Sequence, residues 1–270
     1  MAHATNSDLN TLLLNSDAED IHILIDHITD KGEGRISLSS DACAQLVRAK
    51  KFNKVSPDDV ALLVTEIRAF GGNTVFNLFR GGNGVPYKEI LCDVADHLKV
   101  NYNSKNDCAT IEMAVLLKVL EQSIEKMTAQ EREELFESLG GSFTGTGPLM
   151  MASLQAAIRV SGFAAYKLAA VVAQATAKAI LGRGLAFTTT APLMRGISAF
   201  AGPIGWAVTG IWTAFDMASP AYRVTVPCVV QIAYMRQKQL SENAEMRCPK
   251  CNVPVTKGTK FCGECGNRLS

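Results

Sequence analysis

Histidine is scarce in this sequence, and the common catalytic motifs are missing. The chain has four histidines in 270 residues, and none follows His97. It contains no Gly-x-Ser-x-Gly run, no His-Glu-x-x-His run and no ordered set of Ser, His and Asp. The usual hydrolases and metalloproteases need one of these arrangements to place a nucleophile, a base or a zinc ion. We therefore expect a protein that is not an enzyme, and no catalytic residues are nominated.

Acidic residues are also missing from a long stretch, the 78 residues 138–215. Residues 1–145 carry 14 basic and 22 acidic side chains, a net charge of −8. Residues 146–247 have a net charge of +6 and residues 248–270 one of +3. Such a separation indicates modules with different surroundings. The whole chain sums to +1, so we expect no general affinity for nucleic acid.

A basic flank followed by an apolar run is absent from Met1–Asn10, so we expect no secretory signal and a cytoplasmic location. In that reducing compartment cysteines bind metal more often than they form disulfides. Four of the eight cysteines are scattered along the chain, and we interpret them as small core residues. These four are Cys43, Cys92, Cys108 and Cys228.

Helix signals dominate the first 140 residues. Capping patterns predict four helix starts, and apolar residues follow each of them at helical spacing. The patterns are Ser16 with Glu19, Ser56 before Pro57, Asp107, and Thr128 with Glu131. Gly-Gly pairs at 71–72 and 140–141 predict helix ends, and residues 143–148 predict a linker.

An apolar, basic region follows this linker. Residues 150–181 predict one long helix whose polar residues share one arc: Gln155, Arg159, Lys167, Gln174 and Lys178. Such a helix suits either an anionic lipid surface or the acidic N-terminal module. Residues 196–215 form an uncharged run that is long enough to cross a bilayer but is interrupted by Gly202-Pro203. It predicts either a buried hairpin or a membrane-inserted segment.

The C-terminal end of the chain carries two Cys-x-x-Cys pairs. Cys248 and Cys251 are separated by ten residues from Cys262 and Cys265. This spacing is typical of a structural zinc ribbon, in which four thiolates hold one Zn²⁺ ion. An iron–sulfur cluster and a redox dithiol are the alternatives. Gly263 and Gly266 are expected in its tight turns, and residues 236–246 predict the linker before it.

The predicted fold is an all-α, multi-helix bundle with an apolar Gly/Ala-rich helical region and a small C-terminal zinc ribbon. We expect an N-terminal helical segment at 1–50, an acidic helical domain at 51–145, an apolar basic region at 146–240 and the ribbon at 246–270. Two i,i+4 pairs, His22 with Asp26 and Asp93 with His97, are interpreted as surface interactions rather than metal ligands.

Three runs resemble the YaaW-like family of uncharacterised bacterial proteins: Phe70-Gly-Gly-Asn-Thr, the stretch 80–93 from Arg80 to Asp93, and 219–227 from Ser219 to Pro227. The resemblance covers most of residues 5–240, and the ribbon looks like an added module. The family is grouped with the ubiquinol–cytochrome c chaperones, which implies a helical bacterial protein and, by that grouping alone, assembly of a membrane complex.

These observations favour a non-enzymatic interaction or assembly factor that binds an unknown protein partner and carries a structural zinc ribbon. The alternative is a membrane-active protein in which residues 150–235 bind or enter the bilayer, with association at the inner membrane.

Overall fold

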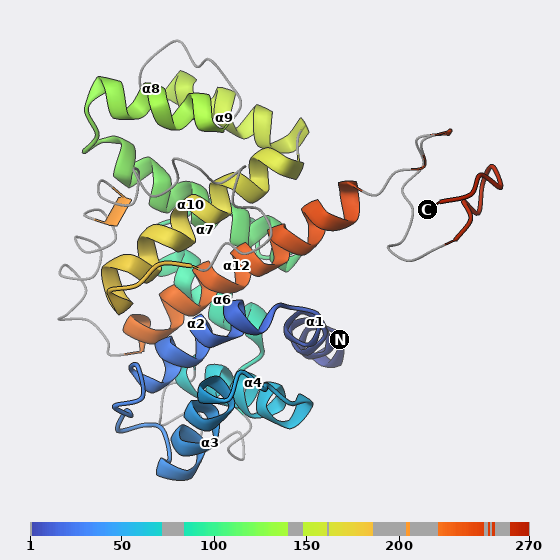
Figure 1. Ribbon diagram of the computed structural model, residues 1–270. Coiled ribbons are helices and arrows are strands. Elements are labelled where there is room, and N and C mark those ends of the chain that lie inside the picture. The colour runs from blue at the N-terminus through green and yellow to red at the C-terminus, as the bar shows by residue number, and fades with distance from the viewer. Residues whose placement is uncertain are drawn as a thin grey trace.

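The computed structural model describes residues 2–71, 84–139, 148–160, 162–185, 204–205, 221–245, 248, 250–251 and 260–269. These residues form ten α-helices and no strand beyond one isolated bridge, which confirms the predicted all-α class (Figure 1). The helices are α1 (Ala2–Leu14), α2 (Ala18–Thr29), α3 (Ser40–Lys51), α4 (Pro57–Gly71), α6 (Tyr87–His97), α7 (Cys108–Ile124), α8 (Ala129–Ser138), α9 (Pro148–Val160), α10 (Gly162–Leu181) and α12 (Tyr222–Glu245).

Three of the four predicted helix starts are confirmed. Asp107 caps α7 by accepting a hydrogen bond from the Thr110 amide at 2.7 Å, and Thr128 with Glu131 forms a full capping box on α8. Ser56 Oγ accepts from the Asp59 amide before α4 at 3.2 Å. The Ser16 prediction is wrong: Asp17 is the N-cap of α2, and the Ser16 hydroxyl instead donates back to the Leu12 carbonyl of α1 at 2.8 Å.

Helix α12 is the central element of the bundle. It packs against α10 most extensively, and also against α1, α2, α4, α6 and α7. Figure 1 shows α12 crossing the middle of the molecule beside α10, with α1 to α4 below and α8 and α9 above. The hydrophobic side chains from Val224 to Met235 are buried in the core, and Val229, Ile232 and Ala233 are fully buried. The C-terminal part of the chain therefore completes a core that the N-terminal helices begin.

The predicted single helix over residues 150–181 is wrong. It is two helices: α9 ends at Val160 and α10 begins at Gly162, and these two residue types have low helix propensity. The single polar arc fails with it: Gln155 and Lys178 are exposed, whereas Gln174 is buried and accepts a hydrogen bond from the Leu185 amide.

Among the described residues, α10 is the one helix whose length and composition would suffice to cross a membrane. Most of α10 is buried against its neighbours, as a core helix of a water-soluble bundle would be. The uncharged run 196–215 lies outside the described residues except for 204–205, which are helical. The predicted linker at 143–147 also lies outside them, and α9 begins at Pro148.

The predicted linker at 236–246 is wrong as well, because α12 continues to Glu245. Its polar composition suggested a solvated connection, yet Arg236, Gln237, Lys238 and Ser241 are all buried. Pro227 lies inside α12 rather than in its first turn, so one helical hydrogen bond is missing there. The neighbouring valines, Val226, Val229 and Val230, are all buried in the core.

Candidate metal centre and the buried ion pairs

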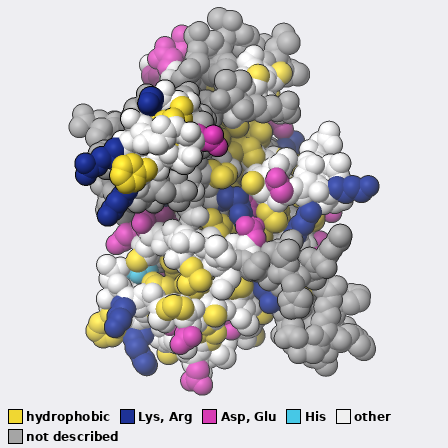
Figure 2. All heavy atoms as spheres, turned by 90° about the vertical axis from the view of Figure 1, so that its right-hand side faces the viewer, with side chains coloured by type: hydrophobic (Ala, Val, Ile, Leu, Met, Phe, Trp, Pro, Cys, Tyr) yellow, Lys and Arg dark blue, Asp and Glu magenta, His cyan; other side chains and the backbone are white. Residues whose placement is uncertain are grey.

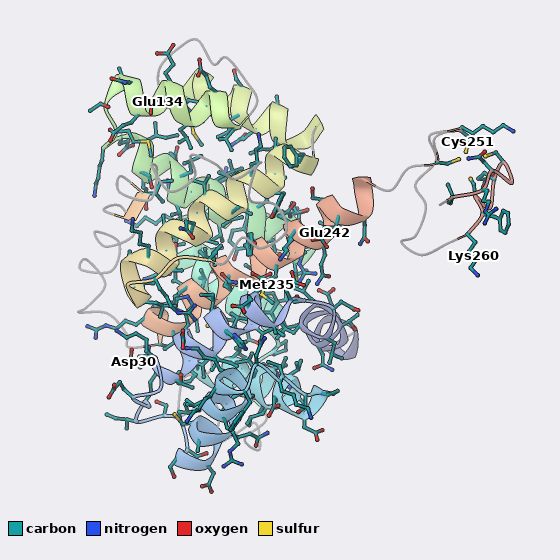
Figure 3. The ribbon with its side chains drawn as sticks, viewed as in Figure 1. Asp30, Glu134, Met235, Glu242, Cys251 and Lys260 are labelled. Carbon is teal, nitrogen blue, oxygen red and sulfur yellow. The ribbon has the colours of Figure 1, made fainter. Side chains whose placement is uncertain are left out.

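The four predicted metal ligands come together in the structure. The sulfur atoms of Cys248, Cys251, Cys262 and Cys265 all lie within 4.8 Å of one another. Figure 3 shows Cys251 and Lys260 in this C-terminal module, beyond the end of α12 and outside the helical body. The cluster therefore stands as a separate unit attached to the central helix.

The sulfur spacing fits a tetrahedral metal ion. Cys248 Sγ lies 3.4 Å from Cys265 Sγ, and Cys251 Sγ lies 3.5 Å from Cys262 Sγ. Four sulfurs at about 2.3 Å from one ion would be separated by about 3.8 Å, whereas a disulfide brings two sulfurs to about 2.05 Å. Both short contacts join one Cys-x-x-Cys pair to the other. Contacts also join the two cysteines within each pair, so all four sulfurs form one cluster.

A short hairpin holds the second pair of ligands. Phe261 and Arg268 form an antiparallel bridge, the Cys262 amide donates to the Asn267 carbonyl at 2.8 Å, and the Leu269 amide donates to Lys260 at 2.9 Å. Gly266 closes the turn with a φ of 66°, in the left-handed region that glycine adopts without strain. Gly263 does not have a positive φ, so only one of the two predicted turn glycines is needed for its conformation.

Backbone amides favour the thiolate form of two ligands. Burial raises the pKa of the Cys248 thiol, but hydrogen bonds from the Cys251 and Lys250 backbone outweigh it and lower the pKa to about 6. Backbone hydrogen bonds from Cys265 and Glu264 lower the pKa of Cys262 in the same way. In each pair, the sulfur of the first cysteine thus accepts hydrogen bonds from the backbone amides two and three residues further along the chain. Deprotonated sulfur is the form that binds metal.

The other four cysteines fit the core interpretation. Cys108 and Cys228 are buried, and burial raises the pKa of their thiols to about 11 and about 12. Cys43 and Cys92 are half-buried and pack against the core. For Cys108 and Cys228 the neutral thiol is the form that these surroundings favour, in contrast to Cys248.

One of the two histidine pairs does not behave as predicted. His22 and Asp26 are both buried, and the imidazole of His22 lies 3.9 Å from Glu19 instead. The ring of His97 stacks on Tyr222 with centroids 3.7 Å apart. The surface interpretation is therefore wrong for His22 and Asp26, which belong to the core.

Sequence reasoning missed a buried network centred on Arg236 of α12. Arg236 Nε donates to Glu112 of α7 at 2.7 Å, and Arg236 Nη1 donates to Asp8 of α1 at 3.1 Å. The Tyr87 hydroxyl of α6 donates to the other oxygen of Glu112 at 2.8 Å. Burial raises the pKa of Glu112, although Arg236 opposes that effect. Four helices meet in this one set of contacts.

A second network lies two residues further along α12. Lys238 Nζ contacts Asp17 at 2.5 Å and Asp20 at 2.7 Å, and Gln239 donates to the Leu12 carbonyl and to Ser16. The absence of Gly or Pro between Pro227 and Pro249 was the sequence signal that α12 continues this far.

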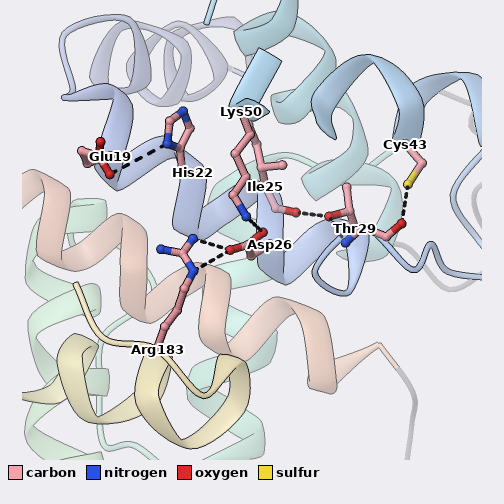
Figure 4. Close-up of polar contacts among 9 residues, drawn as sticks. Glu19, His22, Ile25, Asp26, Thr29, Cys43, Lys50 and Arg183 are labelled. Atoms are coloured by element: carbon pink, nitrogen blue, oxygen red, sulfur yellow. Dashed lines mark hydrogen bonds and ion pairs between the residues drawn. The ribbon is translucent and has the colours of Figure 1, made fainter. Parts of the chain in front are cut away.

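The third network joins three segments at Asp26 of α2 (Figure 4). Lys50 of α3 and Arg183, which follows α10, both bind this buried carboxylate, with Arg183 Nε at 2.9 Å. Gly184 lets the chain pass the Gln174 side chain at this point, because an added Cβ would lie 2.3 Å from its amide nitrogen. In each of the three networks, acids of the first 145 residues bind a base of the later region.

The fold and this site define the protein as an all-helical bundle with a C-terminal four-cysteine cluster that could hold a metal ion. The comparisons place it more narrowly. A UPF0174 protein of Helicobacter pylori strain J99 is 44% identical over 189 residues, which cover 68% of this chain and 74% of that protein. A second UPF0174 protein of that strain is 39% identical over 186 residues, which cover 67% of this chain and 88% of that protein. The chain belongs to the UPF0174 family.

The resemblance to YaaW is confirmed at greater distance. The UPF0174 protein YaaW of Escherichia coli strain K12 is 30% identical over 179 residues, which cover 65% of this chain and 70% of YaaW. No protein-family model matches the chain, and no solved structure matches it. The names of these relatives state no activity, so the site must be interpreted from its own chemistry.

Replacing Arg236 with Met should lower the free energy of unfolding by about 3–5 kcal/mol, because Glu112 would remain buried without its cation. Urea unfolding followed by circular dichroism measures this change. Lys178→Met on the exposed side of α10 is the control and should change stability by less than about 0.5 kcal/mol. Adding Glu112→Gln to Arg236→Met should cost less than the sum of the single changes. Simple additivity would show that the two side chains do not interact.

Acid should destabilise the bundle through its buried histidines. Burial lowers the pKa of His27 to about 3 and lowers the pKa of His22 and His97 as well. In the unfolded chain each titrates near 6.5, so below that pH the unfolded state binds protons that the folded state does not. Stability should therefore fall as pH drops from about 6.5 towards 3, by up to about 1.4 kcal/mol per pH unit for His27 alone. Unfolding curves of a His27→Leu variant at pH 6.5 and 5 should show a shallower loss than the wild type; an identical loss would contradict this assignment.

Proposed function

We propose that the protein is a non-enzymatic interaction or assembly factor whose C-terminal cysteines hold one structural zinc ion. The observation that carries the proposal is the set of four sulfur atoms within 4.8 Å of one another, all supplied by the protein. An ion with four protein ligands has no open position for substrate or water, which is typical of structural rather than catalytic zinc.

Zinc is the ion that this ligand set favours. Four thiolates in two Cys-x-x-Cys turns match tetrahedral Zn²⁺, and a redox dithiol would need only one pair whereas all four sulfurs gather at one point. Iron bound by the same sulfurs is the remaining chemical alternative. A hairpin this small buries too little apolar surface to fold alone, so metal affinity would supply its folding free energy.

The buried acids of the bundle support a structural rather than a catalytic role. Glu112, Asp20 and Asp26 are nearly inaccessible, and each is bound to a basic side chain of the same chain. Carboxylates neutralised in this way are poor candidates for proton transfer to a substrate. We therefore propose that the helical body docks a protein partner in the cytoplasm, and that the ribbon adds a second, basic surface.

The purified protein should contain one zinc ion per chain by elemental mass spectrometry. Cys251→Ser removes one of four ligands and should lower the bound zinc at least tenfold after dialysis against a mild chelator, because the affinity depends on the complete set. Cys43→Ser, a half-buried cysteine outside the cluster, is the matched control and should keep one zinc. Iron in place of zinc, or equal metal loss from both variants, would contradict the proposal.

Cross-linking and affinity capture from the native cytosol should recover a defined set of partner proteins with the wild type. The partners that contact the ribbon should be lost with Cys251→Ser and kept with Cys43→Ser. A recovered set that is identical for both variants would remove the ribbon from the interaction and leave only the helical body.

The membrane alternative is tested on the same preparations. It is favoured by the length and composition of α10, but insertion would require α10 to leave the core and Arg183 to separate from Asp26. The wild type should remain in the soluble fraction and should not release dye from anionic vesicles. Asp26→Asn weakens the contact with Arg183 and should make release of α10 easier. If the wild type releases dye and this variant releases more, the membrane proposal would replace the docking proposal.

A further inference from the structure

The ribbon hairpin exposes an aromatic side chain that its metal site does not need. Phe261 is 61% exposed, although it directly precedes the buried ligand Cys262. The ring contributes to no described hydrophobic cluster. An isolated exposed Phe is unremarkable by itself, so its neighbours decide what it could bind.

Arg268 lies opposite Phe261 on the other arm of the hairpin. The two are bridge partners, and the flanking hydrogen bonds from Leu269 to Lys260 and from Cys262 to Asn267 leave them as a pair without hydrogen bonds between them. In such a pair the side chains lie on the same face and at the closest cross-strand spacing. The hairpin thus presents a planar ring and a guanidinium side by side, and both are exposed.

The charge around this pair is positive. Lys250 and Lys260 are also exposed in the ribbon, with Glu264 as its one acid, and residues 248–270 have a net charge of +3. Figure 2 shows Lys and Arg side chains gathered around a hydrophobic side chain on the upper left of the face that it displays. By contrast, Arg183, Arg236 and Lys238 of the preceding region are bound to acids within the bundle.

We propose that this basic–aromatic surface of the ribbon, in which Phe261 and Arg268 share one face and Lys250 and Lys260 are exposed in the same module, binds single-stranded nucleic acid. A base stacks on the Phe261 ring, and the neighbouring phosphates contact Arg268 and the lysines. Aromatic platforms within a basic surface bind single strands in this way with little sequence preference. The inference rests on the proposed metal-held ribbon and gives its basic surface a ligand.

The net charge of the whole chain does not oppose this binding. Charges on the acidic helices are screened beyond about 8 Å at physiological salt, and the ribbon lies outside the helical body. The local charge of the ribbon therefore determines whether a nucleic acid is attracted to it. This charge is positive, whereas that of residues 1–145 is negative.

One other exposed aromatic provides the matched comparison. Phe52 is 69% exposed at the end of α3, with Lys51 and Lys54 exposed beside it. Its helix carries Lys50 as well, but that side chain is bound to Asp26. Phe52 thus has basic neighbours, as Phe261 does, but no arginine paired with it across a hairpin. Variants at Phe52 therefore show whether binding needs the paired geometry or only an aromatic ring near positive charge.

Fluorescence anisotropy of labelled 12-nucleotide oligo-dT and oligo-U with full-length, zinc-loaded protein tests the proposal. The dissociation constant should be on the order of 10⁻⁵ M at 50 mM salt. The logarithm of affinity should fall with the logarithm of salt at a slope of about −2, as expected for three phosphate contacts on a single strand. Equal affinity for both oligomers would show that the sugar is not recognised, and a preference for oligo-U would identify RNA.

The variants distinguish stacking from charge. Phe261→Leu keeps an apolar side chain but should weaken binding about tenfold, whereas Phe261→Tyr should retain it. Arg268→Glu should weaken binding and lower the salt slope, while Lys54→Glu, with the same change in net charge, should do neither. Phe52→Leu should have no effect.

Each contrary result has a distinct meaning, because zinc content is measured on every sample. A zinc-loaded protein that fails to bind either oligomer, or that loses binding equally with Phe52→Leu, overturns this inference and leaves the metal site standing. Tighter binding of a Glu-rich peptide than of the oligomers would also overturn it in favour of an acidic protein ligand. A protein that carries no zinc contradicts the metal proposal on which the inference rests.

Discussion

Buried pairing of opposite charges joins the two halves of this chain. Asp8, Asp20, Asp26 and Glu112 sit within the N-terminal helices, and their counter-ions Arg183, Arg236 and Lys238 arrive from more than 120 residues later. A carboxylate as deeply buried as Glu112 or Asp20 is strongly unfavourable without a cation, so these two acids require α12 to be in place. Net charges of −8 and +6, which suggested separate modules, are in part the two sides of one interface. The position of α12 follows from these contacts.

Local chemistry was readable from the sequence where a few neighbouring residues decide the outcome. Asp107 and Thr128 cap their helices because a capping hydrogen bond spans three residues. The four cysteine ligands were predicted individually, because two-residue gaps bring both sulfurs of a pair to one point. Ser16 shows the limit of this reasoning: Asp17 competes for the same cap, and the Leu12 carbonyl of the preceding helix takes the serine hydroxyl.

The ion-pair networks could not be predicted in the same way, since they depend on which helices meet. Arg236 and Lys238 looked like a solvated linker because polar residues usually face water, and only the acids placed opposite them by α1, α2 and α7 make burial favourable. The prediction for Gln174 failed for the same reason: helical periodicity placed it on a shared polar arc, whereas the Leu185 amide, which follows α10, donates a hydrogen bond to its buried side chain. Tertiary contacts outweighed helical periodicity at these positions.

The long sequence separation of these pairs has a consequence for biogenesis. A ribosome adds about 5–20 residues per second, so Asp8 and Asp20 emerge roughly 10–50 s before the cations near residue 236. During that interval the nascent N-terminal helices hold acids that cannot yet be desolvated, and a compact early intermediate with a sealed core is unfavourable. Folding of the bundle is thereby tied to completion of the last helix, so a polypeptide released early would expose unsealed apolar surface to chaperones and proteases.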